Sequence, residues 1–183
     1  MSLHTYAVRS LNMNEPVWKL GPHSDVTYYS PPEYAQVCQA LREGVGSGYG
    51  GCLVIGPSMT GKTRMILEAL RQEAGEYLLV HWPHVRVHMD EFASLAGQPV
   101  ALLLDDMQDL IARQELGNIL RVIEDLRAHA SALLIIVAAQ PKIHDHAVLG
   151  YLGETFKRLV QINLTPLALD SPETTRFVTQ VVS

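Results

Sequence analysis

The sequence lacks the features that mark disulfide-bonded, secreted and membrane-spanning proteins. Only two of its 183 residues are cysteines, Cys38 and Cys52, and nothing resembles a disulfide framework. Cys52 lies in an apolar run, where a free, buried thiol is the ordinary expectation. No basic-then-apolar signal segment opens the chain, and its longest apolar run, 132–139, is less than half of the roughly 20 residues that a membrane helix requires. We therefore expect a soluble, cytoplasmic protein with no membrane partner.

Clusters of basic residues are also absent. The formal net charge is −5, and no group of five or more Lys and Arg residues occurs. A strongly electrostatic nucleic-acid surface is therefore not indicated. Apolar residues make up 48% of the chain, which is enough for an ordinary three-layer core. The length suits one domain, or one domain with the beginning of a second.

A glycine-containing segment at residues 56–63, called the glycine loop below, carries the clearest signal in the chain. Its sequence, GPSMTGKT, matches the Walker A pattern G-x-x-x-x-G-K-[ST]. The apolar run 51–55 before it predicts a buried strand, and residues 64–71 after it place apolar side chains at helical spacing. Strand, loop and helix N-terminus together form an anion site, because backbone N–H groups and the helix dipole converge on phosphate oxygens.

The residue types of the glycine loop suit a nucleoside triphosphate and its metal ion. Glycines let the backbone approach the ligand closely. Lys62 can reach the β- and γ-phosphates, and the Thr63 hydroxyl can coordinate Mg²⁺. We predict that the nucleotide is contacted by Gly56, Pro57, Ser58, Met59, Thr60, Gly61, Lys62, Thr63 and Arg64.

Strands and helices alternate through most of the chain. Continuous apolar strands predict a parallel sheet with both faces covered by helices, so we expect a three-layer α/β/α sandwich with a five-stranded, mainly parallel sheet. Besides 51–55, strands are predicted at 77–82, 100–104, 132–138 and 158–164, and helices at 33–42, 62–74, 89–96, 115–129 and 145–156.

The predicted core spans residues 32–167, with one segment before it and one after it. Residues 1–31 contain three prolines and little periodicity, which predicts an irregular leader, and the glycines of 43–51 predict a linker without regular structure. Residues 168–183 read as the start of a truncated helical lid, since Ser171 can cap a helix that runs to the C-terminus. We expect the chain to be a piece of a longer protein.

Two carboxylates follow the predicted strand 100–104, about forty residues after the glycine loop. Asp105 and Asp106 resemble the Walker B motif in this position. Alone, an acidic pair after a strand is weak support, because Asp is common in turns and helix caps. Paired with the glycine loop it indicates hydrolysis, which needs charge neutralisation on the γ-phosphate and a positioned nucleophile.

With both motifs present, residues 25 to 180 resemble a P-loop NTPase of the additional-strand type, most similar to the AAA+ and STAND regulatory ATPases. The resemblance implies ATP and Mg²⁺ as ligands, and a Walker B strand between the Walker A strand and its neighbour. It implies that Asp105 and Thr63 hold the metal, that Asp106 polarises the attacking water, and that Lys62 and Gln140, a sensor of the γ-phosphate, complete the catalytic set. It also implies partners: further domains of the same chain or an oligomeric ATPase assembly.

The chain departs from the family pattern at several positions. The sensor is more often Asn, Ser, Thr or Arg than Gln, and Asp106 replaces the Glu that is typical of AAA+ machines. An acidic pair of two Asp residues is more like the STAND switches, which turn over slowly. Arg158 is either an arginine finger or a solvated charge at a strand edge. The predicted function is a slowly hydrolysing, ATP-binding regulatory domain.

Other functions remain as alternatives. A nucleic-acid-associated ATPase, such as a helicase or a transposition-type loader, would bind DNA in a salt-dependent way. A small phosphotransferase would need an Arg-rich lid, and the segment after the sheet is short of arginine. A GTPase is set aside, because the guanine-reading Asn-Lys-x-Asp motif is absent. The motifs do not separate a slow switch from a nucleotide-binding scaffold without turnover.

Histidines raise the question of a zinc site. His81, His84 and His88 form one series, and His144 and His146 form another. No Cys or carboxylate completes a tetrahedral set with them, so ordinary surface histidines are the expected reading.

Overall fold

The computed structural model describes residues 9–10, 31–82, 95–141, 143 and 158–165. Most of the predicted leader, the helices predicted at 89–96 and 145–156, and the lid predicted at 168–183 lie wholly or largely outside the described residues. His84, His88, His144 and His146 lie outside them as well.

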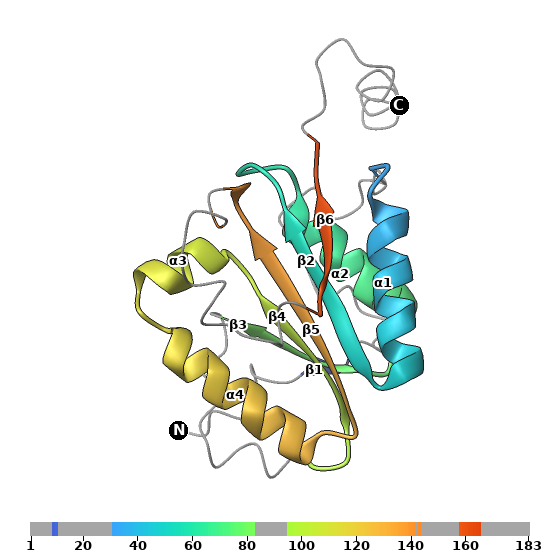
Figure 1. The fold of residues 1–183 in the computed structure, drawn as a ribbon. Coiled ribbons are helices and arrows are strands. Elements are labelled where there is room, and N and C mark those ends of the chain that lie inside the picture. Colours follow the sequence, from blue (N-terminus) through green and yellow to red (C-terminus); the bar gives the residue numbers. More distant parts are fainter. Residues whose placement is uncertain (1–8, 11–30, 83–94, 142, 144–157, 166–183) are drawn as a thin grey trace.

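A twisted parallel sheet forms the centre of the molecule (Figure 1). The five-stranded α/β fold predicted from the apolar runs is confirmed. A short strand, β1 (Arg9–Ser10), pairs antiparallel with one edge, within the predicted leader. The parallel strands are β2 (Tyr49–Ile55), β3 (Leu78–Trp82), β4 (Pro99–Leu104), β5 (Ala132–Ala139) and β6 (Val160–Asn163), and the spatial order is β1-β3-β4-β5-β2-β6.

The order of the strands corrects one expectation. β5 lies between β2, which precedes the glycine loop, and β4, which precedes Asp105. The prediction that the strand before the acidic pair lies next to the strand before the glycine loop is therefore wrong. The apolar patterns could not reveal this, because β4 and β5 are both buried almost throughout and either would fit beside β2.

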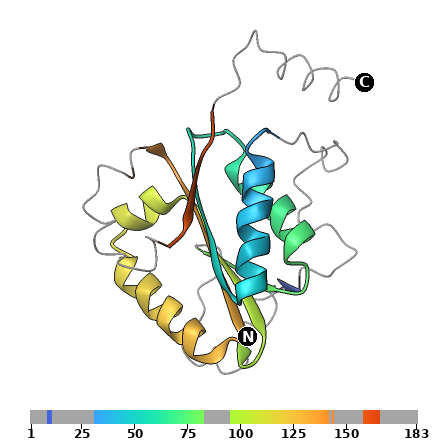
Figure 2. The ribbon, with the colours of Figure 1, turned by 45° about the vertical axis from the view of Figure 1, so that its right-hand side comes forward.

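Helices cover both faces of the sheet, as the three-layer prediction requires. In Figures 1 and 2, helices α1 and α2 lie on one side, and helices α3 and α4 on the other. Their bounds are Tyr34–Ser47, Lys62–Glu73, Met107–Ala112 and Leu116–His129. Successive side chains along a strand point to opposite faces of the sheet, so each strand packs against both helix layers. Cys52 packs on the face covered by α1 and α2, and Leu53 packs on the face covered by α3 and α4. The short helix α3 was not predicted.

Helix α1 continues into the segment predicted to be an irregular glycine linker. It ends at Ser47, and Gly48 caps it with a φ of 72°. Gly44 is buried inside this helix, where an added Cβ would lie 2.6 Å from Leu134 Cδ2 and 3.3 Å from Gly50 Cα. Glycine at this position allows the helix to pack closely on the sheet, so here it serves packing rather than loop formation.

Both cysteines are free and buried, which confirms the expectation for Cys52. Burial raises the pKa of Cys52 to about 12. Within the described residues, no helix has the length and apolar character needed to cross a membrane.

Candidate nucleotide-binding site

The predicted site residues gather at the carboxyl edge of the parallel sheet. The glycine loop follows β2, Asp105 follows β4, and Gln140 follows β5. Backbone hydrogen bonds join these strand ends: Gly56 N donates to Ala139 O at 3.1 Å, and Asp105 N donates to Trp82 O at 3.0 Å. Ligands of open α/β sheets bind beyond this edge.

The backbone of the glycine loop requires its two glycines for different reasons. Gly61 has a φ of 76° and caps the N-terminus of α2, a conformation that L side chains rarely adopt. An added Cβ on Gly56 would lie 2.9 Å from Leu164 Cβ and 3.0 Å from Thr60 Oγ1. Met59 also has a positive φ, 63°, and its side chain is 99% exposed. The loop thus presents backbone, with Ser58 and Met59 on its outer side.

The side chain of Lys62 contacts the backbone of the glycine loop. Its Nζ donates to the carbonyl oxygens of Gly56 at 3.0 Å and Pro57 at 2.8 Å, and its side chain is buried. Desolvation lowers the pKa of Lys62, while the carboxylates of Asp106 and Asp105 act in the opposite direction. The hydrogen bonds of this buried ammonium group go to neutral carbonyl oxygens, so an anion bound beside it would be electrostatically favoured.

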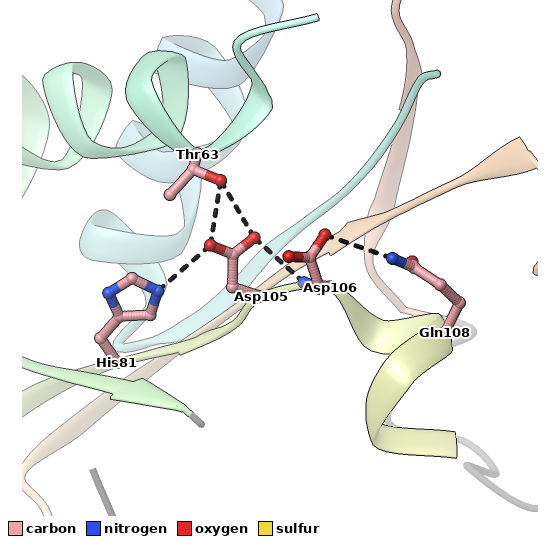
Figure 3. A network of polar contacts seen from close by, with 5 residues as sticks. All are labelled: Thr63, His81, Asp105, Asp106 and Gln108. Carbon is pink, nitrogen blue, oxygen red and sulfur yellow. Dashed lines mark hydrogen bonds and ion pairs between the residues drawn. The ribbon is translucent and has the colours of Figure 1, made fainter. Parts of the chain in front are cut away.

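The Thr63 hydroxyl and the Asp105 carboxylate meet at the centre of the site (Figure 3). Thr63 Oγ1 lies 3.0 Å from Asp105 Oδ1 and 2.9 Å from Oδ2. Asp105 Oδ1 also accepts from the Asp106 backbone N–H at 3.0 Å, and Oδ2 lies 3.2 Å from His81 Nε2. Burial pushes the pKa of Asp105 upward, but the hydrogen bonds from His81 and Thr63 outweigh it, so the pKa lies below the ordinary value. The carboxylate is ionised at neutral pH.

A second chain of contacts joins Asp106 to the end of β5. Asp106 is exposed, has a φ of 47° and forms the N-cap of α3. Gln108 Nε2 donates to Asp106 Oδ1 at 3.2 Å, and the Gln140 backbone N–H donates to Gln108 Oε1 at 3.1 Å. The predicted base and the predicted sensor are therefore bridged by a glutamine that the sequence reasoning missed. Its position just after the acidic pair was the available signal.

Arg64 directly follows Thr63 in α2, whereas Arg158 lies in another part of the fold. Arg64 forms an i,i+4 ion pair with Glu68 at 3.2 Å on α2. Arg158 is exposed in the turn before β6. Val160 lies opposite Cys52, so Arg158 precedes the amino end of β6, whereas the glycine loop follows the carboxyl end of the neighbouring, parallel β2. Arg158 cannot act on the loop of its own chain, and a role as an arginine finger would have to be exerted on another copy.

The reading of His81 as a surface histidine is wrong, because this residue is 7% exposed. It lies on β3, one residue before the carboxyl end of that strand, beside the end of β4. The parallel sheet brings such strand ends together, and this was the signal for its position. Within the described residues, no group of three or more His, Cys, Asp and Glu side chains is placed to hold a metal ion.

The residues present nevertheless fit Mg²⁺ delivered with a nucleotide. Mg²⁺ prefers hard oxygen ligands and is usually held by one or two protein groups together with substrate phosphates and water. The Thr63 hydroxyl and the ionised Asp105 carboxylate supply such oxygens within 3.0 Å of each other. They lie at the N-terminus of α2, where the helix dipole favours phosphate.

Comparison with solved structures places the fold among known ones. The chain is similar in structure to PCH-2 of C. elegans, a AAA+ ATPase, with a TM-score of 0.50 and 12% sequence identity. The similarity covers 75% of this chain but only 44% of the PCH-2 chain. It shows that this chain and part of PCH-2 share a similar fold. No protein-family model matches the sequence, and no curated protein matches it either.

Proposed function

We propose that this chain binds ATP with Mg²⁺ at the glycine loop and hydrolyses it slowly, as a regulatory domain of the AAA+ or STAND kind within a larger protein or assembly. The observation that carries the proposal is the contact between the Thr63 hydroxyl and the buried Asp105 carboxylate. It joins the end of the glycine loop to the acidic strand end, although the residues are 42 positions apart. ATP is favoured over GTP because the guanine-reading motif is absent.

Each residue of the site has a distinct role in this proposal. Lys62 and the backbone N–H groups at the start of α2 bind the phosphates. Thr63 and Asp105 hold Mg²⁺, which neutralises developing phosphate charge when it is bound. Asp106, exposed beside the site and oriented by Gln108, accepts a proton from the attacking water. Gln140 lies at the end of β5 as the γ-phosphate sensor.

Binding and turnover test different parts of the proposal. Lys62→Ala removes the only side-chain cation of the loop and should abolish ATP binding measured by calorimetry. A variant that binds ATP as the wild type does would show that the site is assigned wrongly.

Asp106→Asn keeps the size of the side chain but not its basicity, so it should preserve binding and slow phosphate release. Unchanged turnover in that variant would remove Asp106 from the role of base.

A further inference from the structure

His81 is a buried polar side chain that none of the roles above uses. It comes from β3, while its contact, Asp105, follows the neighbouring strand β4. The two side chains are 8% and 9% exposed, and Nε2 lies 3.2 Å from Oδ2 (Figure 3). Buried polar groups of this kind are held by specific partners, because an unpaired buried group is costly.

The chemistry of the pair fixes the direction of the hydrogen bond. An ionised carboxylate only accepts hydrogen bonds, so Nε2 of His81 carries the proton that it shares with Asp105 Oδ2. Thr63 and the Asp106 backbone N–H donate to the same carboxylate. His81 therefore completes the ring of donors around a carboxylate that has about four lone-pair sites.

The backbone of β3 also holds the main chain of Asp105. Trp82 O accepts from Asp105 N at 3.0 Å, so the residue after His81 fixes the main chain of Asp105 while His81 fixes its side chain. Groups that hydrogen-bond to a metal ligand orient it and commonly change metal affinity when they are removed. In Figure 3, Thr63 approaches the carboxylate from α2, and His81 approaches it from β3.

We propose that His81 is a positioning residue for Mg²⁺: its Nε2–H holds the Asp105 carboxylate in the orientation that receives the metal carried by the nucleotide. The inference rests on the proposed function and deepens it. It assigns to β3 a part in metal recognition, while phosphate recognition stays with the glycine loop. The two recognition steps are therefore separable by mutation.

His81→Phe keeps an aromatic ring of similar size and removes the donor. We expect it to weaken binding of ATP in the presence of Mg²⁺ about tenfold, and to leave ATP binding in EDTA unchanged. His81→Gln carries an amide N–H that reaches the position of Nε2, so it should restore most of the Mg²⁺-dependent affinity. His81→Asn is too short for this contact and should behave like His81→Phe, which provides a second variant without the hydrogen bond to Asp105 should the Phe variant not fold.

Val80→Ala is the matched control for lost packing, because Val80 is fully buried on the same strand. It should lower the melting temperature while keeping the ratio of affinities with and without Mg²⁺. An equal loss of affinity in both conditions for the Phe and Asn variants, no loss at all, or no rescue by His81→Gln would overturn the role of His81. A wild-type protein that binds no ATP in either condition would instead overturn the proposed function.

Discussion

Thr63 Oγ1 lies within 3.0 Å of both oxygens of the Asp105 carboxylate, so one hydroxyl bridges the side chain that follows β4 and the helix that follows β2. One strand, β5, separates β2 from β4 in the sheet. The first residues of α2 span this gap above the carboxyl edge. In the proposed function, Thr63 is therefore the residue at which phosphate and metal recognition meet.

Replacing this hydroxyl should remove the effect of Mg²⁺ on nucleotide binding. Thr63→Val keeps the shape of the side chain but offers neither a metal ligand nor a donor to Asp105. We expect its affinity for ATP to be the same with Mg²⁺ as in EDTA, as measured by calorimetry. Ser47→Ala is the control, because it also removes one hydroxyl, which donates to Tyr49 O at 2.7 Å outside the glycine loop. A Thr63→Val variant that keeps the wild-type enhancement by Mg²⁺ would contradict the assignment.

Gln108 should affect turnover without affecting binding. Within the described residues, its side chain connects Asp106 Oδ1 with the backbone N–H of Gln140, and neither partner belongs to the glycine loop. Gln108→Leu should therefore slow ATP hydrolysis about tenfold by releasing the carboxylate, at an unchanged dissociation constant. Asp109→Asn, an exposed change on the same helix, should leave the rate as it is. Equal rates for Gln108→Leu and the wild type would show that the bridge has no part in catalysis.

Two glycine substitutions should change stability in opposite directions. At Gly51, φ is 141° and an added Cβ would lie 1.9 Å from the Ile135 carbonyl oxygen, so Gly51→Ala should lower the free energy of unfolding by about 3 kcal/mol or more. At Gly46, an added Cβ meets nothing within 4 Å, and Gly46→Ala should raise that free energy by about 0.5–1 kcal/mol. Denaturant titration of both variants provides the measurement. A neutral Gly51→Ala would be incompatible with the described packing of β2 on β5.

Cys52 should make the fold sensitive to alkaline pH. Burial raises its pKa from 9.0 to about 12, so the unfolded chain loses the thiol proton before the native protein does. The resulting stability is fully present below pH 9 and is lost progressively as the pH rises toward 12. Above pH 9, the free energy of unfolding of the wild type should therefore fall relative to that of Cys52→Ala. A difference that stays constant from pH 8 to pH 11 would contradict the buried, protonated thiol.

The sequence allowed most of the sheet to be predicted, because its strands are continuous apolar runs such as 100–104 and 132–138, and five parallel strands were found. The strand order was predicted wrongly, because the sequence of a strand that is buried on both faces does not indicate which strands lie next to it. Helix α1 was predicted too short, because Gly44 was read as a loop former while its role is close packing against Leu134.

Of the candidate site, the sequence predicted the parts that are encoded in local motifs. The glycine loop and the acidic pair are contiguous in sequence, and the structure brings Thr63 and Asp105 together. His81 and Gln108 were missed, because their positions follow from which strands lie side by side and from a short helix with little periodicity. Such contacts depend on tertiary structure rather than on a local pattern.

A calorimetric titration of the wild-type chain with ATP and Mg²⁺ tests the proposed nucleotide site. We expect saturable binding of one ATP per chain, weaker binding of GTP, and a marked loss of affinity when EDTA removes the metal. A titration that shows no saturable binding of ATP, or equal binding of ATP with and without Mg²⁺, would contradict the proposal.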